Sequence, residues 1–245
     1  MKPVSANLLP LVDRLAAVHQ SIVQCERCPR LRTYCQQVAQ EKRRAYRDET
    51  YWGRPVPGFG DPSARLLLVG LAPAAHGANR TGRVFTGDGI GGSGDFLMSA
   101  LHRTGFANIP TSRRVDDGLT LRDAYIAAAV RCAPPANAPR PEEITRCLDH
   151  LEAEVAELRR LQVVVALGKI AFDVWLRVLK RQGTPMPSPR PQFGHGTLVR
   201  TEDASNGAPR VLLGCYHPSR QNTNTGTLTA SMMDAVFRKA RRLLR

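Results

Sequence analysis

The 245-residue sequence contains no apolar run of the ~20 residues that a membrane-spanning helix requires. Apolar runs such as residues 66–72 and 163–167 are far shorter. Asp13 and Arg14 interrupt the apolar N-terminal stretch, which is atypical of a signal peptide. These features predict a cytoplasmic protein without membrane association. Cysteines are normally reduced in that compartment, so we expect the 6 cysteines to be thiols or metal ligands rather than disulfides.

Acidic residues are scarce, and lysine is scarcer still. Asp and Glu number 21 against 35 Lys and Arg, for a formal net charge of +14 and a pI near 10.3. A basic surface attracts polyanions, so this charge favours a nucleic acid as the partner. Only 5 of the 35 basic residues are lysine, a bias that GC-rich genomes also produce. Charge alone therefore leaves compositional drift open as a second explanation.

Two common phosphate-binding motifs are missing. The sequence has no G-x-x-x-x-G-K-[ST] loop. Pro73 and the long insertion after it break the strand–turn–helix context of a dinucleotide-binding fingerprint. The glycine-rich segment 70–88 instead lets the backbone approach a ligand of another kind.

Apolar runs typical of buried strands alternate with helical patterns. The predicted strands are residues 65–72, 125–130, 162–168 and 211–216. The helical patterns are residues 94–103, 141–161, 169–180 and 228–243, preceded by residues 7–23 and 30–47. This alternation predicts a three-layer α/β/α sandwich with a central, mostly parallel four-stranded sheet. We expect a single domain, 1–245, with N-terminal helices in 1–47 and the α/β core in 64–245.

Ligands of open α/β sheets bind beyond the carboxyl ends of the strands. The loops that follow the first, second and fourth predicted strands are therefore candidates for the site. The first contains Phe85, which could stack on a planar ligand or pack into the core, and Asp88, which could be catalytic or stabilise a turn. The second presents Asn137 between prolines, suited to recognising a base edge or to forming a turn. The third begins with His217, which could be catalytic or structural.

The cysteines suggest a metal site. Cys25 and Cys28 form a C-x-x-C pair, and Cys132 and Cys147 follow much later in the chain. Four thiolates from two regions could bind zinc or an iron–sulfur cluster, and the spacing does not choose between them. A lone redox pair with two buried thiols is the alternative. Cys35 and Cys215 fall within a predicted helix and a predicted strand, and we expect both to be small core residues.

Three segments in this order resemble the uracil-DNA glycosylase superfamily, and specifically its type-5 branch. They are GLAPAAHGANRTGRVFTGD at 70–88, RCAPPANAP at 131–139 and HPSRQNTNTG at 217–226. The resemblance extends from about Cys25 to the C-terminal residue. It implies a monomeric, nucleoid-associated repair enzyme that flips uracil, and other deaminated or modified bases, out of double-stranded DNA. The base is then hydrolytically excised, which leaves an abasic site.

The resemblance also implies roles for residues of the three segments. Phe85 would stack on the extruded base, Asn137 would read its Watson–Crick edge, and backbone amides near Gly70 and Leu71 would contact the pyrimidine carbonyls. His217 would stabilise charge on the departing base. Asp88 would position water or stabilise the cationic sugar.

Arg220 and Gln221 would contact the DNA around the vacated space, by the same resemblance. Cys25, Cys28, Cys132 and Cys147 would hold a [4Fe–4S] cluster of structural function. Type-4 relatives carry an acidic residue where this sequence has Leu71, so the resemblance implies a dissociative, oxocarbenium-like mechanism. Two other classes of protein remain as alternatives: a non-catalytic iron–sulfur protein that binds damaged DNA, and a cluster-dependent redox enzyme.

Overall fold

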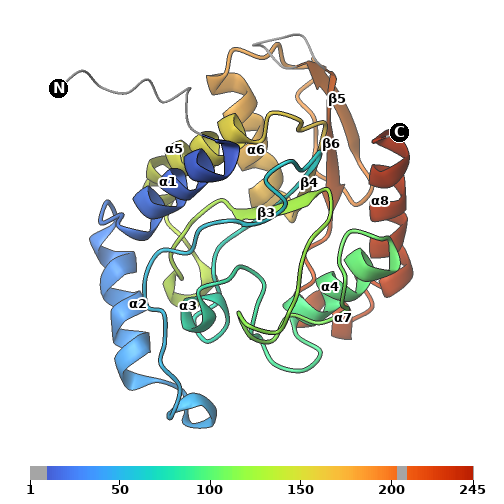
Figure 1. Ribbon diagram of the computed structural model, residues 1–245. Helices are drawn as coiled ribbons and strands as arrows, with labels where there is room; N and C mark the ends of the chain where they lie inside the picture. The colour runs from blue at the N-terminus through green and yellow to red at the C-terminus, as the bar shows by residue number, and fades with distance from the viewer. Residues whose placement is uncertain (1–9, 203–208, 245) are drawn as a thin grey trace, which may run out of the picture.

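The computed structural model describes residues 10–202 and 209–244, which form a three-layer α/β/α arrangement (Figure 1). One sheet contains six strands in the order β1-β3-β2-β4-β6-β5. The strands are β1 (Phe59–Gly60), β2 (Leu66–Gly70), β3 (Ala124–Ala128), β4 (Val163–Leu167), β5 (Leu198–Glu202) and β6 (Pro209–Cys215). The four central strands pair in parallel, whereas β1 and β5 pair antiparallel at the two edges.

The α/β fold and the four central strands confirm the prediction, but the predicted strand number was wrong. The sequence analysis missed β1 and β5, the antiparallel edge strands. Central parallel strands are covered on both faces and read as continuous apolar runs. β1 has only two residues, and β5 buries alternate residues along its length, so neither produces such a run.

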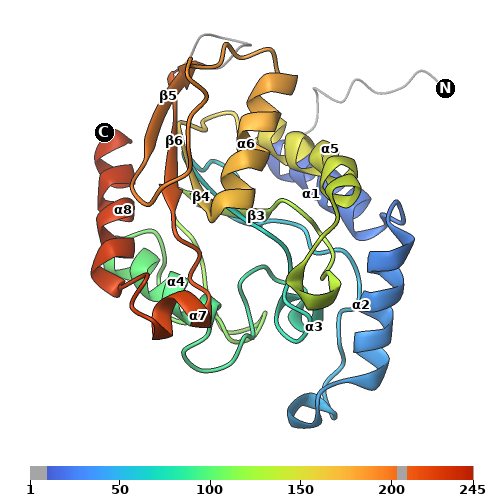
Figure 2. The same cartoon turned by 180° about the vertical axis from the view of Figure 1, so that it is seen from behind.

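Helices cover both faces of the sheet (Figures 1 and 2). One face packs against α1 (Leu11–Val23), α5 (Pro141–Glu157) and α6 (Lys169–Arg181), and the other packs against α4 (Ser93–Arg103) and α8 (Ala230–Leu243). β2 shows the alternation that this requires: Leu67 and Val69 point into the first core, while Leu66 and Leu68 point into the second. The whole strand is therefore apolar.

Shorter elements gather beyond the carboxyl ends of the central strands (Figure 1). They are α2 (Pro29–Glu41), the 3₁₀ turns η2 (Arg44–Tyr46) and η3 (Pro135–Asn137), α3 (Ala78–Thr81) and α7 (Arg220–Asn224). The predicted helix 30–47 was too long, because Lys42 adopts φ +51° and ends α2 there. The predicted helix 141–161 ends at Glu157, and positions 7–9 of the first predicted helix lie outside the described residues.

None of the helices in the described ranges combines the length and apolar character needed to cross a bilayer.

Candidate active site

A cavity of about 590 Å³ opens at the carboxyl ends of β2, β3 and β6. Its walls come from the three loops in which the sequence analysis placed the chemistry. The predicted site residues that line it are Leu71, Phe85, Asp88, Asn137, His217 and Arg220. Gly70 lies at the buried end of β2 behind this wall, and Gln221 is exposed on α7. The fold thus brings most of the predicted site into one cavity.

Phe85 forms part of the apolar wall. Its ring lies so close to the end of β2 that a β carbon on Gly70 would come within 2.8 Å of its Cε2 atom. Its centroid is 5.9 Å from that of the His217 imidazole, with 31° between the planes. Phe85 packs on the core and also faces the cavity, so both sequence-based interpretations of this residue are compatible with its position.

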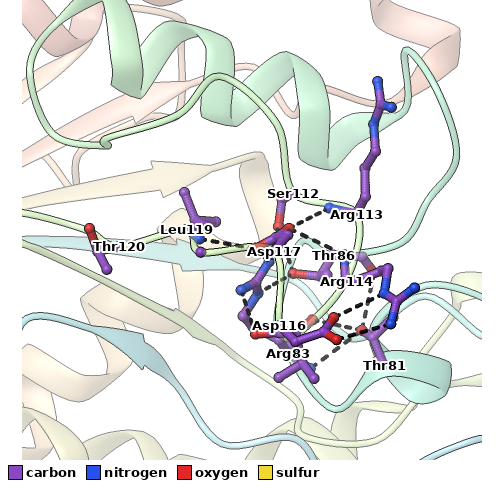
Figure 3. Close-up of polar contacts among 12 residues, drawn as sticks. Thr81, Arg83, Thr86, Ser112, Arg113, Arg114, Asp116, Asp117, Leu119 and Thr120 are labelled. Atoms are coloured by element: carbon purple, nitrogen blue, oxygen red, sulfur yellow. Dashed lines mark hydrogen bonds and ion pairs between the residues drawn. The ribbon is translucent and has the colours of Figure 1, made fainter.

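A buried polar network anchors the loop that carries Phe85 (Figure 3). Arg83 is only 5% exposed, and its Nη2 atom donates to both carboxylate oxygens of Asp117, at 2.7 and 2.9 Å. The Nε atom of Arg83 donates to Oγ1 of Thr86, which lies 2.7 Å from Oγ of Ser112. These contacts hold the backbone on both sides of Phe85, whose φ of +51° is unusual for a bulky residue.

Asp117 is ionised within this network. Burial disfavours its charged form, but hydrogen bonds from Arg83 and from the backbone N–H of Leu119 outweigh that effect and hold its pKa below the usual value. The carboxylate also accepts backbone hydrogen bonds from Arg113 and Arg114 at 2.9 and 3.2 Å. Both carboxylate oxygens therefore accept hydrogen bonds, and these bonds hold the loop that carries Phe85 in place.

Asp88 presents a buried carboxylate at the cavity wall. Its Oδ1 atom is buried and accepts no hydrogen bond from the described residues. Burial raises the pKa of Asp88 to about 6, although the backbone N–H of Gly94 and the charge of Arg220 act in the opposite direction. A carboxylate with this pKa is ionised at neutral pH but poorly satisfied by the protein, so it is suited to bind water or a cationic group.

His217 remains a neutral imidazole near pH 7. Burial lowers its pKa to about 4. Its backbone carbonyl accepts a hydrogen bond of 2.8 Å from Nδ2 of Asn222 in α7, which fixes the strand end to this helix. A neutral imidazole can donate one N–H hydrogen bond to a developing anion. It adds no positive charge to the cavity before the ligand binds.

Asn137 lies at the rim of the cavity. It has φ +55° and follows Ala136, which has φ +53°. Asparagine tolerates this left-handed conformation better than most residues, and its backbone N–H donates to the carbonyl of Pro134 at 3.1 Å. The side chain is exposed and free to meet a ligand entering the cavity.

The cavity also contains residues that the sequence analysis did not assign. Arg43, which directly precedes η2, and Tyr46, the last residue of η2, line it together with His76. The imidazole Nδ1 of His76 lies 3.0 Å from the hydroxyl of Tyr51. The run RRAYR at 43–47 combines positive charge with an aromatic residue, a signal that was available in the sequence.

The cysteines expected to bind a cluster lie in one region. Cys28, Cys132 and Cys147 belong to one buried group, and Cys25 interacts electrostatically with both Cys28 and Cys147. Burial raises the pKa of Cys147 to about 11, and its sulfur accepts a backbone N–H bond of 3.4 Å from Arg131. Within the described ranges, no three His, Cys, Asp or Glu side chains are arranged around a position for one metal ion.

All 6 cysteines are free thiols. Cys35 and Cys215 are fully buried, as expected. Cys35 is also a neighbour of Cys132, with which it shares a side-chain hydrogen bond, so only the tertiary structure relates it to the cysteine region. Cys28, Cys132 and Cys147, with Cys25 near two of them and a backbone N–H directed at the Cys147 sulfur, are donors of the kind that an iron–sulfur cluster takes.

The fold and the cavity define a three-layer α/β/α protein with its ligand site at the carboxyl ends of the parallel strands. A family model described as "Uracil DNA glycosylase superfamily" matches residues 57–244, and the chain belongs to this superfamily. The resemblance stated from the sequence is thereby confirmed.

Curated relatives refine the placement to the type-5 branch. The chain is 50% identical over 220 residues to the "Type-5 uracil-DNA glycosylase" of Mycobacterium bovis, covering 89% of this chain and 78% of the relative. It is 47% identical over 232 residues to the protein of that name from Thermus thermophilus, covering 95% and 99%. Identity to the "Type-4 uracil-DNA glycosylase" of Thermotoga maritima is 30% over 169 residues, covering 64% and 77%.

Proposed function

We propose that this protein is a monofunctional DNA glycosylase that excises uracil, and other deaminated or modified bases, from double-stranded DNA. The observation that carries the proposal is the convergence of Phe85, Asp88, Asn137 and His217 on one cavity. The names of the relatives favour this function over that of a non-catalytic binding protein. The basic net charge supports DNA as the substrate.

The cavity suits a base that has left the stack. Extrusion of a nucleotide costs a few kcal/mol, and stacking on an aromatic ring offsets part of that cost. Phe85 provides such a ring, and the Asn137 amide can both donate to and accept from the Watson–Crick edge of the base. Leu71 on the cavity wall offers no acid to activate water, so bond breaking ahead of water attack is the favoured path.

Cleavage of the N-glycosidic bond places negative charge on the base and positive charge on the sugar. The neutral His217 would donate a hydrogen bond to a carbonyl of the departing base. The ionised Asp88 would stabilise the oxocarbenium-like sugar and hold the water that attacks it. The water oxygen bonds to the sugar carbon, its proton leaves through solvent or Asp88, and the base is protonated after departure.

We also propose that Cys25, Cys28, Cys132 and Cys147 bind a [4Fe–4S] cluster. When bound, the cluster would supply four metal–thiolate bonds that join the segment before α2 to the chain leading to Asn137. A neighbouring ion pair also joins α2 to α5: Arg30 donates to Glu143 at 2.7 and 2.8 Å. The proposed function of the cluster is therefore structural.

The test is incubation of the purified protein with duplex DNA that carries one uracil opposite guanine, followed by alkali to cleave abasic sites. Wild type and Asp88→Ala are compared, with Asp13→Ala as a control, because Asp13 is an exposed aspartate of α1 that does not line the cavity. Cleavage by wild type and by the control, with a loss of at least tenfold in the Asp88 variant, is expected. Equal cleavage by all three proteins would remove Asp88 from the mechanism, and no cleavage by wild type would refute uracil excision.

A further inference from the structure

The mouth of the cavity is bounded by basic and aromatic side chains from two distant segments. Arg43 directly precedes η2, Tyr46 ends it, and Arg220 begins α7; all three line the cavity. A β carbon placed on Gly89 would lie 3.5 Å from Nη2 of Arg220 and 3.9 Å from Oη of Tyr46. The tyrosine hydroxyl and the guanidinium therefore approach the same part of the rim.

Both arginines lack a salt bridge within the part of the chain that the structure describes. Neither Arg43 nor Arg220 forms an ion pair with an acidic side chain in residues 10–202 and 209–244, although Arg220 donates to the carbonyl of Asp88 at 3.4 Å. Burial lowers the pKa of His76 inside the cavity, and the positive charge of Arg43 lowers it further, which places that charge close to the cavity. A cavity mouth with two guanidinium groups that form no salt bridge attracts anions.

Tyr46 is held in place before any ligand arrives. The guanidinium of Arg80 lies over its ring, 3.9 Å from the centroid. Arg80 is itself fixed, because it donates to the carbonyls of His76 and Gly87 at 2.9 and 2.8 Å and pairs with Glu49. The ring therefore loses little freedom on binding, and its hydroxyl is a preorganised donor.

Positive charge continues outward from the mouth. A second, open depression of about 530 Å³ is lined by Arg43, Arg44, Ala45, Arg47 and Asp48. Asp48 pairs with Arg47 at 3.6 Å, but both side chains are more than 70% exposed, so this pair is strongly screened. The surface that leads away from the cavity is consequently basic over the length of η2.

We propose that Arg43 and Tyr46 bind backbone phosphates of the DNA strand beside the extruded nucleotide, across the cavity mouth from Arg220. This inference rests on the proposed function. An extruded nucleotide stays joined to a phosphate on each side, and both phosphates must remain at the mouth when the base is inside. Arg220 binds one of the two phosphates, and Arg43 together with the Tyr46 hydroxyl binds the other. Arg44 and Arg47 extend the contact along the same strand.

The test measures binding rather than excision. A fluorescent duplex with one stable abasic-site analogue is titrated with the full chain at several salt concentrations, between about 50 and 200 mM. The variants are Arg43→Gln, Arg43→Lys and Tyr46→Phe. Arg160→Gln is the matched control, because Arg160 is exposed just before the amino end of β4, whereas the cavity lies at the carboxyl ends of the strands. Circular dichroism melting confirms that each variant is folded.

Loss of one phosphate contact lowers the slope of log affinity against log salt by about 0.9. We expect this change for Arg43→Gln, with roughly 5- to 10-fold weaker binding near 0.1 M salt, recovery in Arg43→Lys and no change in Arg160→Gln. Tyr46→Phe should weaken binding several-fold and leave the slope unchanged, because no charge is lost. An unaltered slope in Arg43→Gln, or failure of wild type to bind the duplex, overturns the proposal. A wild type that binds with these slopes but excises no uracil refutes only the function.

Discussion

The carboxylate of Asp88 lies directly against the backbone of Gly77: a β carbon on Gly77 would come 1.9 Å from Oδ1 of Asp88. Only a residue without a side chain fits there. A β carbon at position 77 would therefore collide with Asp88, and the backbone angles of Gly77, φ −103° and ψ −102°, also lie outside the regions that other residues prefer.

The first prediction concerns this contact. Gly77→Ala should displace the Asp88 side chain and reduce uracil excision by at least tenfold while the protein stays folded. Gly91→Ala, in the same glycine-rich loop, is the control: an added β carbon there meets no atom within 4 Å, although φ +67° makes the substitution strained. If both variants lose activity equally, loop strain rather than displacement of Asp88 is responsible.

The second prediction concerns pH. Burial raises the pKa of Asp88 to about 6, so the ionised form is lost as pH falls through that value. If ionised Asp88 is required, kcat/KM should fall about tenfold per pH unit below about 6 and be level above it. His217, with a pKa near 4, adds no change in the neutral range.

The raised pKa of Asp88 also affects the stability of the folded state, which changes with pH in the direction opposite to that of activity. A carboxyl whose pKa is higher in the folded state favours folding when protonated, and that contribution is lost as pH rises through about 6. Asp88→Asn should therefore increase the melting temperature at pH 8 relative to wild type, and by less at pH 5. A constant difference across this range would contradict the raised pKa.

The third prediction compares substitutions of two adjacent aspartates, Asp116 and Asp117, in the loop of Figure 3. Asp117→Ala leaves the buried Arg83 without its carboxylate, which should cost about 3 kcal/mol and lower the melting temperature by roughly 6–12 °C. Asp116→Ala removes only the exposed partner of Arg114 and should leave melting unchanged. Thermal unfolding followed by circular dichroism distinguishes them, and equal melting of the two variants would show that the buried pair does not stabilise the loop.

The fourth prediction concerns the cysteines. The purified wild type should contain about four irons per chain, and Cys28→Ala should lose them together with stability. Cys215→Ala is the control, because Cys215 is buried in β6 outside the cysteine group. Iron analysis and melting temperature provide the measurements. A wild type without iron, or a Cys28 variant that keeps it, would exclude these ligands.

Much of the core could be read from local patterns. The four central strands appear as apolar runs because both of their faces are covered, and α4, α6 and α8 appear as helical stripes because one face is buried. The edge strands could not be read in this way. β5 buries only alternate residues, and β1 is too short to show any pattern.

The sequence by itself determined which loops line the cavity, because the order of strands and helices dictates which strand ends lie together at one end of the sheet. It also supplied the residue types that Phe85, Asp88, Asn137 and His217 bring to those loops. Only the tertiary structure decided how these groups behave. The raised pKa of Asp88, the space that Gly70 leaves for Phe85 and the position of Arg43 at the mouth all depend on contacts between distant segments. Such contacts determine how deeply each side chain is buried and which charges act on it, and no local pattern of residues encodes either.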